Sequence, residues 1–362
     1  MNVNFAKRAA IVAGTAALGV VVVAGAAQAD PPSGVHRALV GVGSDTTQDV
    51  LNGLSNSIFD PNPTGSSDGY LIASYDATGT SPISTRDGST CQSVVRPDGS
   101  GAGVKALRDD ITAGTHCLDF ARSSSAPNAS GQFDFIPFGV DAVTLAVKTG
   151  STVGGNVTLA DLQHAYNCQD STGAALPTGT FPKINGVTVH PLVPQAGSGT
   201  RKFWASTLGF NATTLPSCVS DVAKNGNSVQ EHNGNALQRT VAADGAEDVM
   251  PFSIAQFIAQ GRSIPGVTDR RNGAVLETVG GVSPTDAGGN LNTAFPITRE
   301  VYNVIQHSRV AESLIKNTFI GSGSEVCTAI YSGTTSVINE YGFGTDANCG
   351  AQSAALTSKD LV

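Results

Sequence analysis

Three short turns rich in glycine, serine and threonine carry the residue types in this chain that are best suited to hold a ligand. They span residues 43–47, 98–103 and 196–200, and each is followed by a run with helical spacing. Backbone N–H groups at a helix N-terminus have no intrahelical partner and carry partial positive charge, so such turns can accept an anion. One turn of this kind is more often an ordinary helix cap, but three with the same chemistry favour a shared anion site.

The charge of the chain excludes a surface built for nucleic acid. The 362 residues include 21 Lys and Arg against 29 Asp and Glu, a net charge of -8, and the basic residues are scattered. Binding to a phosphate backbone requires clustered lysine and arginine. Any bound anion must therefore be held by local hydroxyl and backbone donors.

The sequence lacks the usual motifs of enzyme and metal sites. Its serine-centred turns do not have the G-x-S-x-G spacing of hydrolases, and no G-x-x-x-x-G-K-[ST] nucleotide loop occurs. Its six histidines form neither H-E-x-x-H nor another zinc pattern. We therefore expect no enzyme activity, no metal and no cofactor.

The N-terminus predicts export. Residues 1–29 contain Lys7 and Arg8, an apolar stretch and the sequence Ala27-Gln28-Ala29, which together are typical of a secretory signal peptide cleaved near Ala29. The alternative is a retained membrane anchor. No cysteine follows the apolar stretch to carry a lipid, so we expect a secreted or periplasmic protein.

Six cysteines in an exported chain predict three disulfides. Six cysteines allow 15 pairings. Pairing of sequence neighbours would close loops of about 26, 50 and 22 residues, each stabilising the fold by roughly 3–4 kcal/mol. We expect these neighbouring pairs, Cys91–Cys117, Cys168–Cys218 and Cys327–Cys349.

The segments that position the turns alternate between strand and helix patterns, which is typical of an α/β fold. Apolar runs predict strands at 38–42, 135–137 with 142–148, and 187–192. Amphipathic runs predict helices at 48–58, 159–166, 253–260, 298–307 and 334–341.

The order of these segments resembles the phosphate-binding proteins of ABC transporters. The resemblance covers most of the chain and is carried by residues 41–46, 99–104, 119–127 and 197–201. It implies a two-lobed type II periplasmic-binding-protein fold, with a hinge of two crossover strands that lets the α/β lobes close over one anion. It also implies a discontinuous first lobe, 35–140 with 250–362, and a second lobe, 141–249.

The resemblance further implies a secreted, monomeric solute-binding protein with an ABC permease as its partner. Its ligand would be a small tetrahedral oxyanion, which is phosphate in the family. The implied ligand residues are Ser44, Thr46, Ser100, Ser198, Gly199, Thr200 and Arg201, and we add Asp45, Arg122 and Ser125 as further candidates for the site.

Two positions depart from the family pattern. Pro194 stands where phosphate binders usually have arginine, and Ser125 stands where they have an acidic residue. That acidic residue matters because phosphate near neutral pH carries a proton that a carboxylate can accept, whereas sulfate does not. Asp45 could replace the acceptor, and Arg122 or Arg96 could replace the cation.

These departures leave a second function open. The turn Gly-Ser-Gly-Thr-Arg at 197–201 favours oxyanion capture for uptake or extracellular scavenging. Pro194 and Ser125 instead favour an exported protein that keeps the binding fold without a transport ligand and acts in extracellular or cell-surface interactions.

Overall fold

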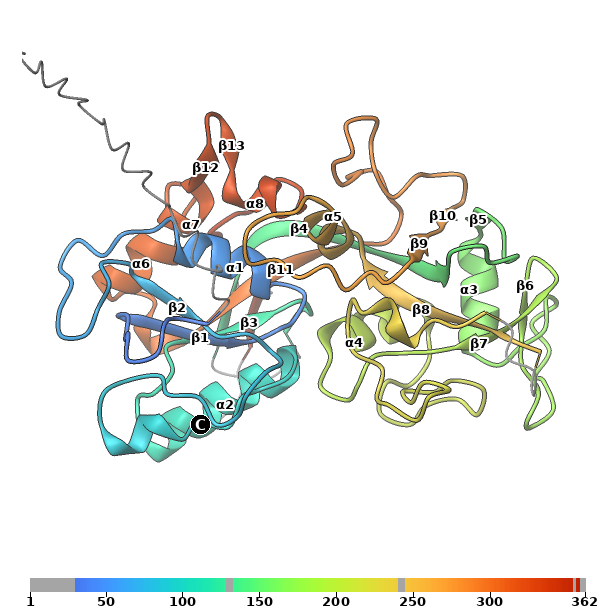
Figure 1. The fold of residues 1–362 in the computed structure, drawn as a ribbon, viewed down its shortest axis with the longest axis horizontal. Coiled ribbons are helices and arrows are strands. Elements are labelled where there is room, and N and C mark those ends of the chain that lie inside the picture. Colours follow the sequence, from blue (N-terminus) through green and yellow to red (C-terminus); the bar gives the residue numbers. More distant parts are fainter. Residues whose placement is uncertain (1–29, 128–132, 240–244, 354–355, 359–362) are drawn as a thin grey trace, which may run out of the picture.

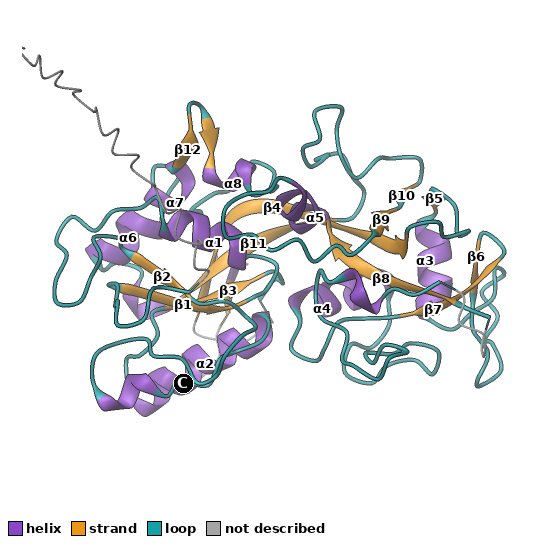
Figure 2. Cartoon of the chain, in the orientation of Figure 1, coloured by secondary structure: helices purple, strands orange, loops and turns teal. Residues whose placement is uncertain are grey.

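Two lobes of strands and helices lie side by side in the computed structural model, which describes residues 30–127, 133–239, 245–353 and 356–358 (Figure 1). The predicted signal peptide, 1–29, lies outside the described residues. Helices flank the strands in both lobes, and long loops surround the short strands of the second (Figure 2). No helix within the described ranges is long and apolar enough to cross a bilayer.

One ten-stranded sheet extends through both lobes. Eight of its strands follow the order β2-β1-β3-β11-β4-β8-β7-β6, and β9 and β14 each pair with β4. In the first lobe, β1 is parallel to β2 and β3, whereas β11 lies antiparallel between β3 and β4. In the second lobe, β7 is parallel to β8 and antiparallel to β6. The strands are β1 (Leu39–Gly43), β2 (Ile72–Ser74), β3 (Phe120–Ser123), β4 (Phe133–Lys148), β5 (Asn156–Val157), β6 (Lys183–Ile184), β7 (Val187–Pro191), β8 (Glu247–Ser253), β9 (Ala274–Leu276), β10 (Thr278–Val279), β11 (Thr298–Gln306), β12 (Ile330–Ser332), β13 (Thr335–Ser336) and β14 (Thr357–Ser358).

Four α-helices, α3, α4, α5 and α8, begin after residues whose side chains cap them. The Ser198 hydroxyl accepts the N–H of Arg201 at the start of α4, and Thr158 forms a reciprocal capping box with Asp161 at the start of α3. The α-helices are α1 (Gln48–Ser55), α2 (Ser100–Ala113), α3 (Leu159–Tyr166), α4 (Gly199–Leu208), α5 (Ile254–Gly261), α6 (Ser313–Phe319), α7 (Glu325–Thr328) and α8 (Val337–Glu340). Short 3-10 turns are η1 (Ser89–Gln92), η2 (Gly234–Ala236) and η3 (His307–Arg309).

Strand β4 carries the chain from the first lobe into the second. Residues 133–142 of β4 pair with β11, whereas residues 143–148 pair with β8 and β9. Strand β8 brings the chain back and ends at Ser253, opposite Val143. The structure thus has the predicted two-lobed α/β fold with two crossover strands. The residue limits of the lobes remain a prediction, and β9 and β10 depart from them by pairing with β4 and β5 of the second lobe.

Strand β11 corrects one prediction from the sequence. We expected a helix over 298–307, but Thr298–Gln306 is a strand, because its threonine, valine, tyrosine and isoleucine side chains suit a pleated surface between two partners. The helix expected at 334–341 is shorter in the structure than predicted. Residues 335–336 form strand β13, and helix α8 covers only Val337–Glu340.

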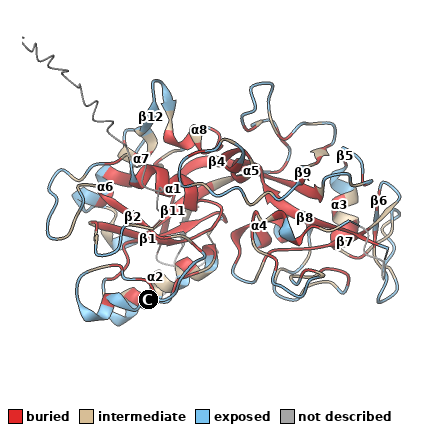
Figure 3. Ribbon diagram, in the orientation of Figure 1, coloured by how far each residue is buried: buried red, intermediate tan, exposed pale blue. Residues whose placement is uncertain are grey.

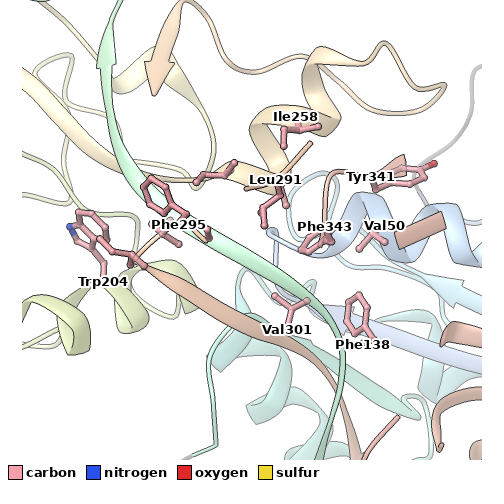
Figure 4. Close-up of a cluster of buried hydrophobic side chains, with 14 of the residues drawn as sticks. Val50, Phe138, Trp204, Ile258, Leu291, Phe295, Val301, Tyr341 and Phe343 are labelled. Carbon is pink, nitrogen blue, oxygen red and sulfur yellow. The ribbon is translucent and has the colours of Figure 1, made fainter. Parts of the chain in front are cut away.

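The largest apolar cluster continues through the hinge. It runs from Trp204 in the second lobe past Phe295 and Val301 to Phe138 and Phe343 in the first (Figure 4). The ring of Trp204 is fully buried and packs edge-on against Tyr166, with 5.6 Å between centroids. Strands β4, β8 and β11 are buried along most of their length (Figure 3). The hinge strands therefore belong to the core of the molecule.

The three predicted disulfides are confirmed. Cys91 pairs with Cys117, Cys168 with Cys218, and Cys327 with Cys349. Each bond closes a loop within a local region of the chain, so none of them links the N-terminal and C-terminal parts of the first lobe.

Candidate anion-binding site between the lobes

The three predicted turns meet where the lobes touch. Helices α2 and α4 lie on either side of this boundary (Figure 1), and the N–H of Gly101 donates across it to the carbonyl of Gly197 at 3.0 Å. A Cβ atom on Gly199 would lie 2.3 Å from the Ser100 Oγ and 2.4 Å from the Ser124 Oγ. The second and third turns are therefore in contact at a distance that requires glycine.

The carboxylate of Glu231 lies among donors from both lobes. Its Oε2 accepts the hydroxyls of Thr46 at 2.9 Å and Thr200 at 3.1 Å, and lies 3.1 Å from Nε2 of His232. Since Nδ1 of His232 accepts the N–H of Ser253, the ring proton is on Nε2, which can donate to Glu231. Three donors thus converge on one fully buried carboxylate oxygen.

The surroundings of Glu231 favour its ionised form. Burial acts to raise the pKa of Glu231, but hydrogen bonds from His232 and Ser198 and the charge of Arg299 outweigh burial and hold this pKa below its usual value. The second carboxylate oxygen, Oε1, is buried without a hydrogen-bond partner in the part of the chain that the structure describes. Glu231 therefore retains an acceptor atom that no described side chain uses.

Arg299 supplies the positive charge next to this carboxylate. Its Nη2 donates to the hydroxyls of Thr200 at 3.0 Å and Thr46 at 3.3 Å, and its guanidinium lies over the ring of Phe203, 5.2 Å from the centroid. Its Nη1 is buried and has no partner among the described residues. One guanidinium thus contacts the first turn and the third turn at once.

Asp141 holds Arg299 in place at the hinge. The two residues face each other on β4 and β11, and Oδ2 of Asp141 accepts Nε and Nη2 of Arg299 at 3.0 and 2.8 Å. The other oxygen, Oδ1, accepts the Ser253 hydroxyl at 2.7 Å and the N–H of Ala255 at 3.1 Å. One carboxylate therefore joins β4, β11 and the start of α5.

Asp45 and Arg122, two predicted ligand residues, are engaged in other contacts. Asp45 forms a bidentate ion pair with Arg270: its Oδ1 accepts Nη2 at 3.0 Å, and its Oδ2 accepts Nη1 at 3.1 Å. Arg122 is fully buried, which lowers its pKa to about 10. Its acceptors are the carbonyls of Gly41, Gly43 and Ser44 and the hydroxyl of Ser74. In this conformation Arg122 supports the end of β1.

Arg201 and Arg96 also hold loops. Arg201 forms an ion pair with Asp221 at 2.7 Å and donates to the carbonyls of Pro194 and Ala212. Arg96 pairs with Asp30 and donates to two backbone carbonyls. The guanidinium among the turns belongs instead to Arg299, which sequence reasoning missed. No motif marks Arg299 or Glu231, and only the register of β11 against β4 would have indicated the former.

A cavity of about 400 Å³ borders the turns. Ser100, Ser125, Ser198 and Arg201 line it, so four of the predicted residues face one space. The other six take part in buried contacts away from its lining, namely Ser44, Asp45, Thr46, Arg122, Gly199 and Thr200. The Ser44 hydroxyl has no hydrogen-bond partner within the described ranges. The assignment of all ten as ligand residues stays a prediction.

Asp98 makes a further contact between the lobes. Its carboxylate accepts the side-chain amides of Gln195 at 2.9 Å and Gln230 at 3.5 Å, while the amide oxygens of both glutamines are buried without a described partner. Burial, together with the charges of Asp45 and Glu231, raises the pKa of Asp98 to about 6. The contact is therefore sensitive to pH in the mildly acidic range.

No protein-family model and no curated protein matches this chain. Among solved structures, it is similar to an ABC-type phosphate transport receptor from Vibrio cholerae, with 15% identity, coverage of 85% of this chain and 100% of the receptor, and a TM-score of 0.49. A phosphate-binding protein from Stenotrophomonas maltophilia has 15% identity, coverage of 86% and 91%, and a TM-score of 0.44. The regulatory domain of a LysR family regulator from N. meningitidis has 12% identity, coverage of 86% and 99%, and a TM-score of 0.38.

Replacing Gly199 by alanine should separate the lobes. The added Cβ would overlap the hydroxyls of Ser100 and Ser124, and the lobes can relieve the overlap by rotating apart. We expect small-angle scattering to show a larger radius of gyration for Gly199→Ala than for the unchanged protein. Gly155→Ala is the matched control, because a Cβ at Gly155 meets nothing within 4 Å. An equal radius for all three proteins would contradict a tight contact between these turns.

Asp98→Asn should stabilise the protein at pH 7 and leave its stability unchanged at pH 4. Because the folded-state pKa of Asp98, about 6, lies above the ordinary aspartate value of 3.8, the stability that this group contributes is present below pH 4 and is lost as the pH rises through 6. The amide introduced by the substitution stays neutral and can donate to a glutamine oxygen. Thermal unfolding across this pH range should show a Tm difference of a few degrees that grows with pH. A constant difference would show that Asp98 has an ordinary pKa.

Proposed function

We propose that this protein captures a small tetrahedral oxyanion, with phosphate as the favoured ligand, between its two lobes. One observation carries the proposal: the hydroxyls of Thr46 and Thr200, from opposite lobes, converge with the guanidinium of Arg299 around a single buried carboxylate oxygen. A group of donors that holds one oxyanion oxygen is chemically suited to hold another. The role is binding rather than catalysis, in ABC-type uptake or extracellular scavenging.

An anion would reach these donors when the lobes move apart. In the structure, the hydroxyls of Thr46 and Thr200 are 3.2 Å from each other, which leaves no space for a ligand between them. Rotation about β4 and β8 would separate Thr46 from the N-terminus of α4, where Ser198, Gly199 and Thr200 offer hydroxyl and N–H donors. Closure around the anion would then restore contacts between the lobes through the ligand.

Glu231 supports phosphate over sulfate. An ionised carboxylate accepts a hydrogen bond from a protonated oxyanion and repels one that has no proton. Its Oε1, which has no partner among the described residues, is an acceptor of the kind that the family has at the position where this chain has Ser125. We therefore assign to Glu231 the role for which the sequence suggested Asp45, whose carboxylate is paired with Arg270.

The three disulfides fit an exported protein, and an ABC permease is the partner proposed for uptake. We propose that the protein works as a monomer outside the cytoplasm, after removal of residues 1–29.

Calorimetric titration of the protein lacking residues 1–29 tests this function. We expect phosphate and arsenate to bind with micromolar or lower Kd. Thr200→Ala should weaken phosphate binding by about tenfold or more, since it removes one buried donor. Thr213→Ala is the control, because Thr213 lines the outer cavity without contacting Glu231. Absence of heat and of any ligand-induced rise in Tm with phosphate, arsenate, sulfate and molybdate would refute the proposal.

Glu231→Gln should reduce the preference for phosphate over sulfate. The substitution keeps the size of the side chain but removes its charge, so sulfate is no longer repelled and the proton of phosphate loses its ionised acceptor. A charged hydrogen bond contributes about 1.5–3 kcal/mol, so the ratio of the two Kd values should fall by roughly 10- to 100-fold. Glu312→Gln, on the exposed N-cap of α6, should leave the ratio unchanged. An unaltered ratio in Glu231→Gln would assign the proton acceptor to another residue.

A second candidate function is an extracellular interaction protein that keeps the fold without a transport ligand. The contacts of Glu231 favour it, because a carboxylate of the protein itself already occupies the donors of both lobes. Glu231→Ala separates the two candidates. Oxyanion binding by the unchanged protein supports capture, whereas binding by the variant alone, or by neither protein, supports the interaction protein.

A further inference from the structure

One arginine, Arg270, joins the first turn to the segment that carries Glu231. Its guanidinium forms a bidentate ion pair with Asp45, whose side chain is fully buried. Its backbone N–H donates to Oε1 of Gln260 at 2.9 Å, and its carbonyl accepts the N–H of Gly234 at 2.9 Å. Because both backbone groups of Arg270 are hydrogen-bonded, its guanidinium is held in one place opposite Asp45.

The charge of Asp45 acts on the buried groups around the first turn. Asp45 directly precedes Thr46, whose hydroxyl donates to Glu231. Together with burial, this charge raises the pKa of Asp98 in the second turn and of Asp49 on α1. A carboxylate that affects its neighbours in this way would also repel an anion bound at Thr46, unless a cation compensates its charge.

Carboxylates outnumber guanidinium groups among the described side chains near this turn. The charged or titratable side chains there, besides Asp45 and Arg270, are Asp49, Asp76, Asp98, Arg122, Asp141, Glu231, His232, Asp269, Arg271 and Arg299. Arg122 donates to the carbonyls at the end of β1, Arg299 pairs with Asp141, and Arg271 pairs with Asp269. Compensation of the Asp45 charge therefore falls to Arg270.

We infer that Arg270 is a specificity-determining residue that acts through Asp45: it cancels the charge of this carboxylate and so lets the first turn hold an oxyanion with two negative charges. This inference rests on the proposed function, because it assigns a further residue to the same site. Coulomb energy is proportional to the product of the two charges. An uncompensated Asp45 would therefore weaken the binding of a dianion by about the square of the factor for a monoanion.

Arg270→Gln tests this inference with inorganic phosphate, which changes from a monoanion to a dianion as the pH rises through neutrality. Calorimetry should show that the variant binds phosphate roughly tenfold more weakly than the unchanged protein at pH 6 and roughly a hundredfold more weakly at pH 8. Arg271→Gln is the matched control, because Arg271 is the next residue in the chain and pairs with Asp269 instead. The other titratable groups are common to these proteins, so their effect cancels in the ratio of Kd values at each pH.

Removal of the charge of Asp45 should reverse the loss. Asp45→Asn combined with Arg270→Gln should recover most of the affinity for phosphate at pH 8, because no uncompensated carboxylate remains. Asp45→Asn alone leaves the guanidinium without its carboxylate and should bind phosphate more tightly than the unchanged protein does. This single variant tests the inference even if Arg270→Gln does not fold.

The outcomes separate this inference from the function on which it rests. If the unchanged protein binds phosphate and Arg270→Gln binds it equally well, the inference is wrong while oxyanion capture stands. An equal loss at both pH values, or no recovery in the double variant, would make the role of Arg270 purely structural and would also overturn the inference. An equal or weaker affinity of Asp45→Asn alone has the same consequence. If the unchanged protein binds no oxyanion, both proposals fail together.

Discussion

The buried ion pair between Asp141 and Arg299 is the constraint on which the arrangement of the lobes depends. Removal of either partner would leave an uncompensated charge in the core, which typically costs about 3–5 kcal/mol. Asp141 is fixed by the Ser253 hydroxyl and the N–H of Ala255, so Arg299 is held against the strands that connect the lobes. The guanidinium that reaches Thr46 and Thr200 is therefore positioned by the hinge itself.

This arrangement couples the chemistry of the site to the motion of the lobes. The first and third turns contact Arg299 at the same point, and the second turn contacts the third through glycine backbone. Other described contacts across the boundary include hydroxyl and amide groups. Neutral hydrogen bonds contribute about 0.5–1.5 kcal/mol each, so a bound anion that contacts both lobes can compete with them.

The features that the sequence predicts correctly are local ones. The turns and the disulfides between neighbouring cysteines follow from residues close together in the chain, whereas the crossover strands follow from the resemblance to a known family. The structure places all of them as expected. Arg299 and Glu231 depend on contacts between distant segments, so no short pattern marks them. Arg122 shows the opposite difficulty, since an arginine beside a serine-rich turn suggests a ligand contact but is buried under the carbonyls of β1. The helix expected over 298–307 is wrong because this segment pairs with β3 and β4, which are distant in sequence, and therefore forms a strand.

The position of β11 has a consequence for the order in which the molecule can fold. This strand lies between β3 and β4, yet its first residue, Thr298, comes 150 residues after Lys148, the last residue of β4. A chain synthesised from its N-terminus therefore presents β3 and the first half of β4 as unpaired edges until residue 306 has emerged. Unpaired edges of this kind invite pairing with other chains. The second lobe, whose strands β6, β7 and β8 precede β11 in sequence, can assemble earlier and serve as the template on which the first lobe closes.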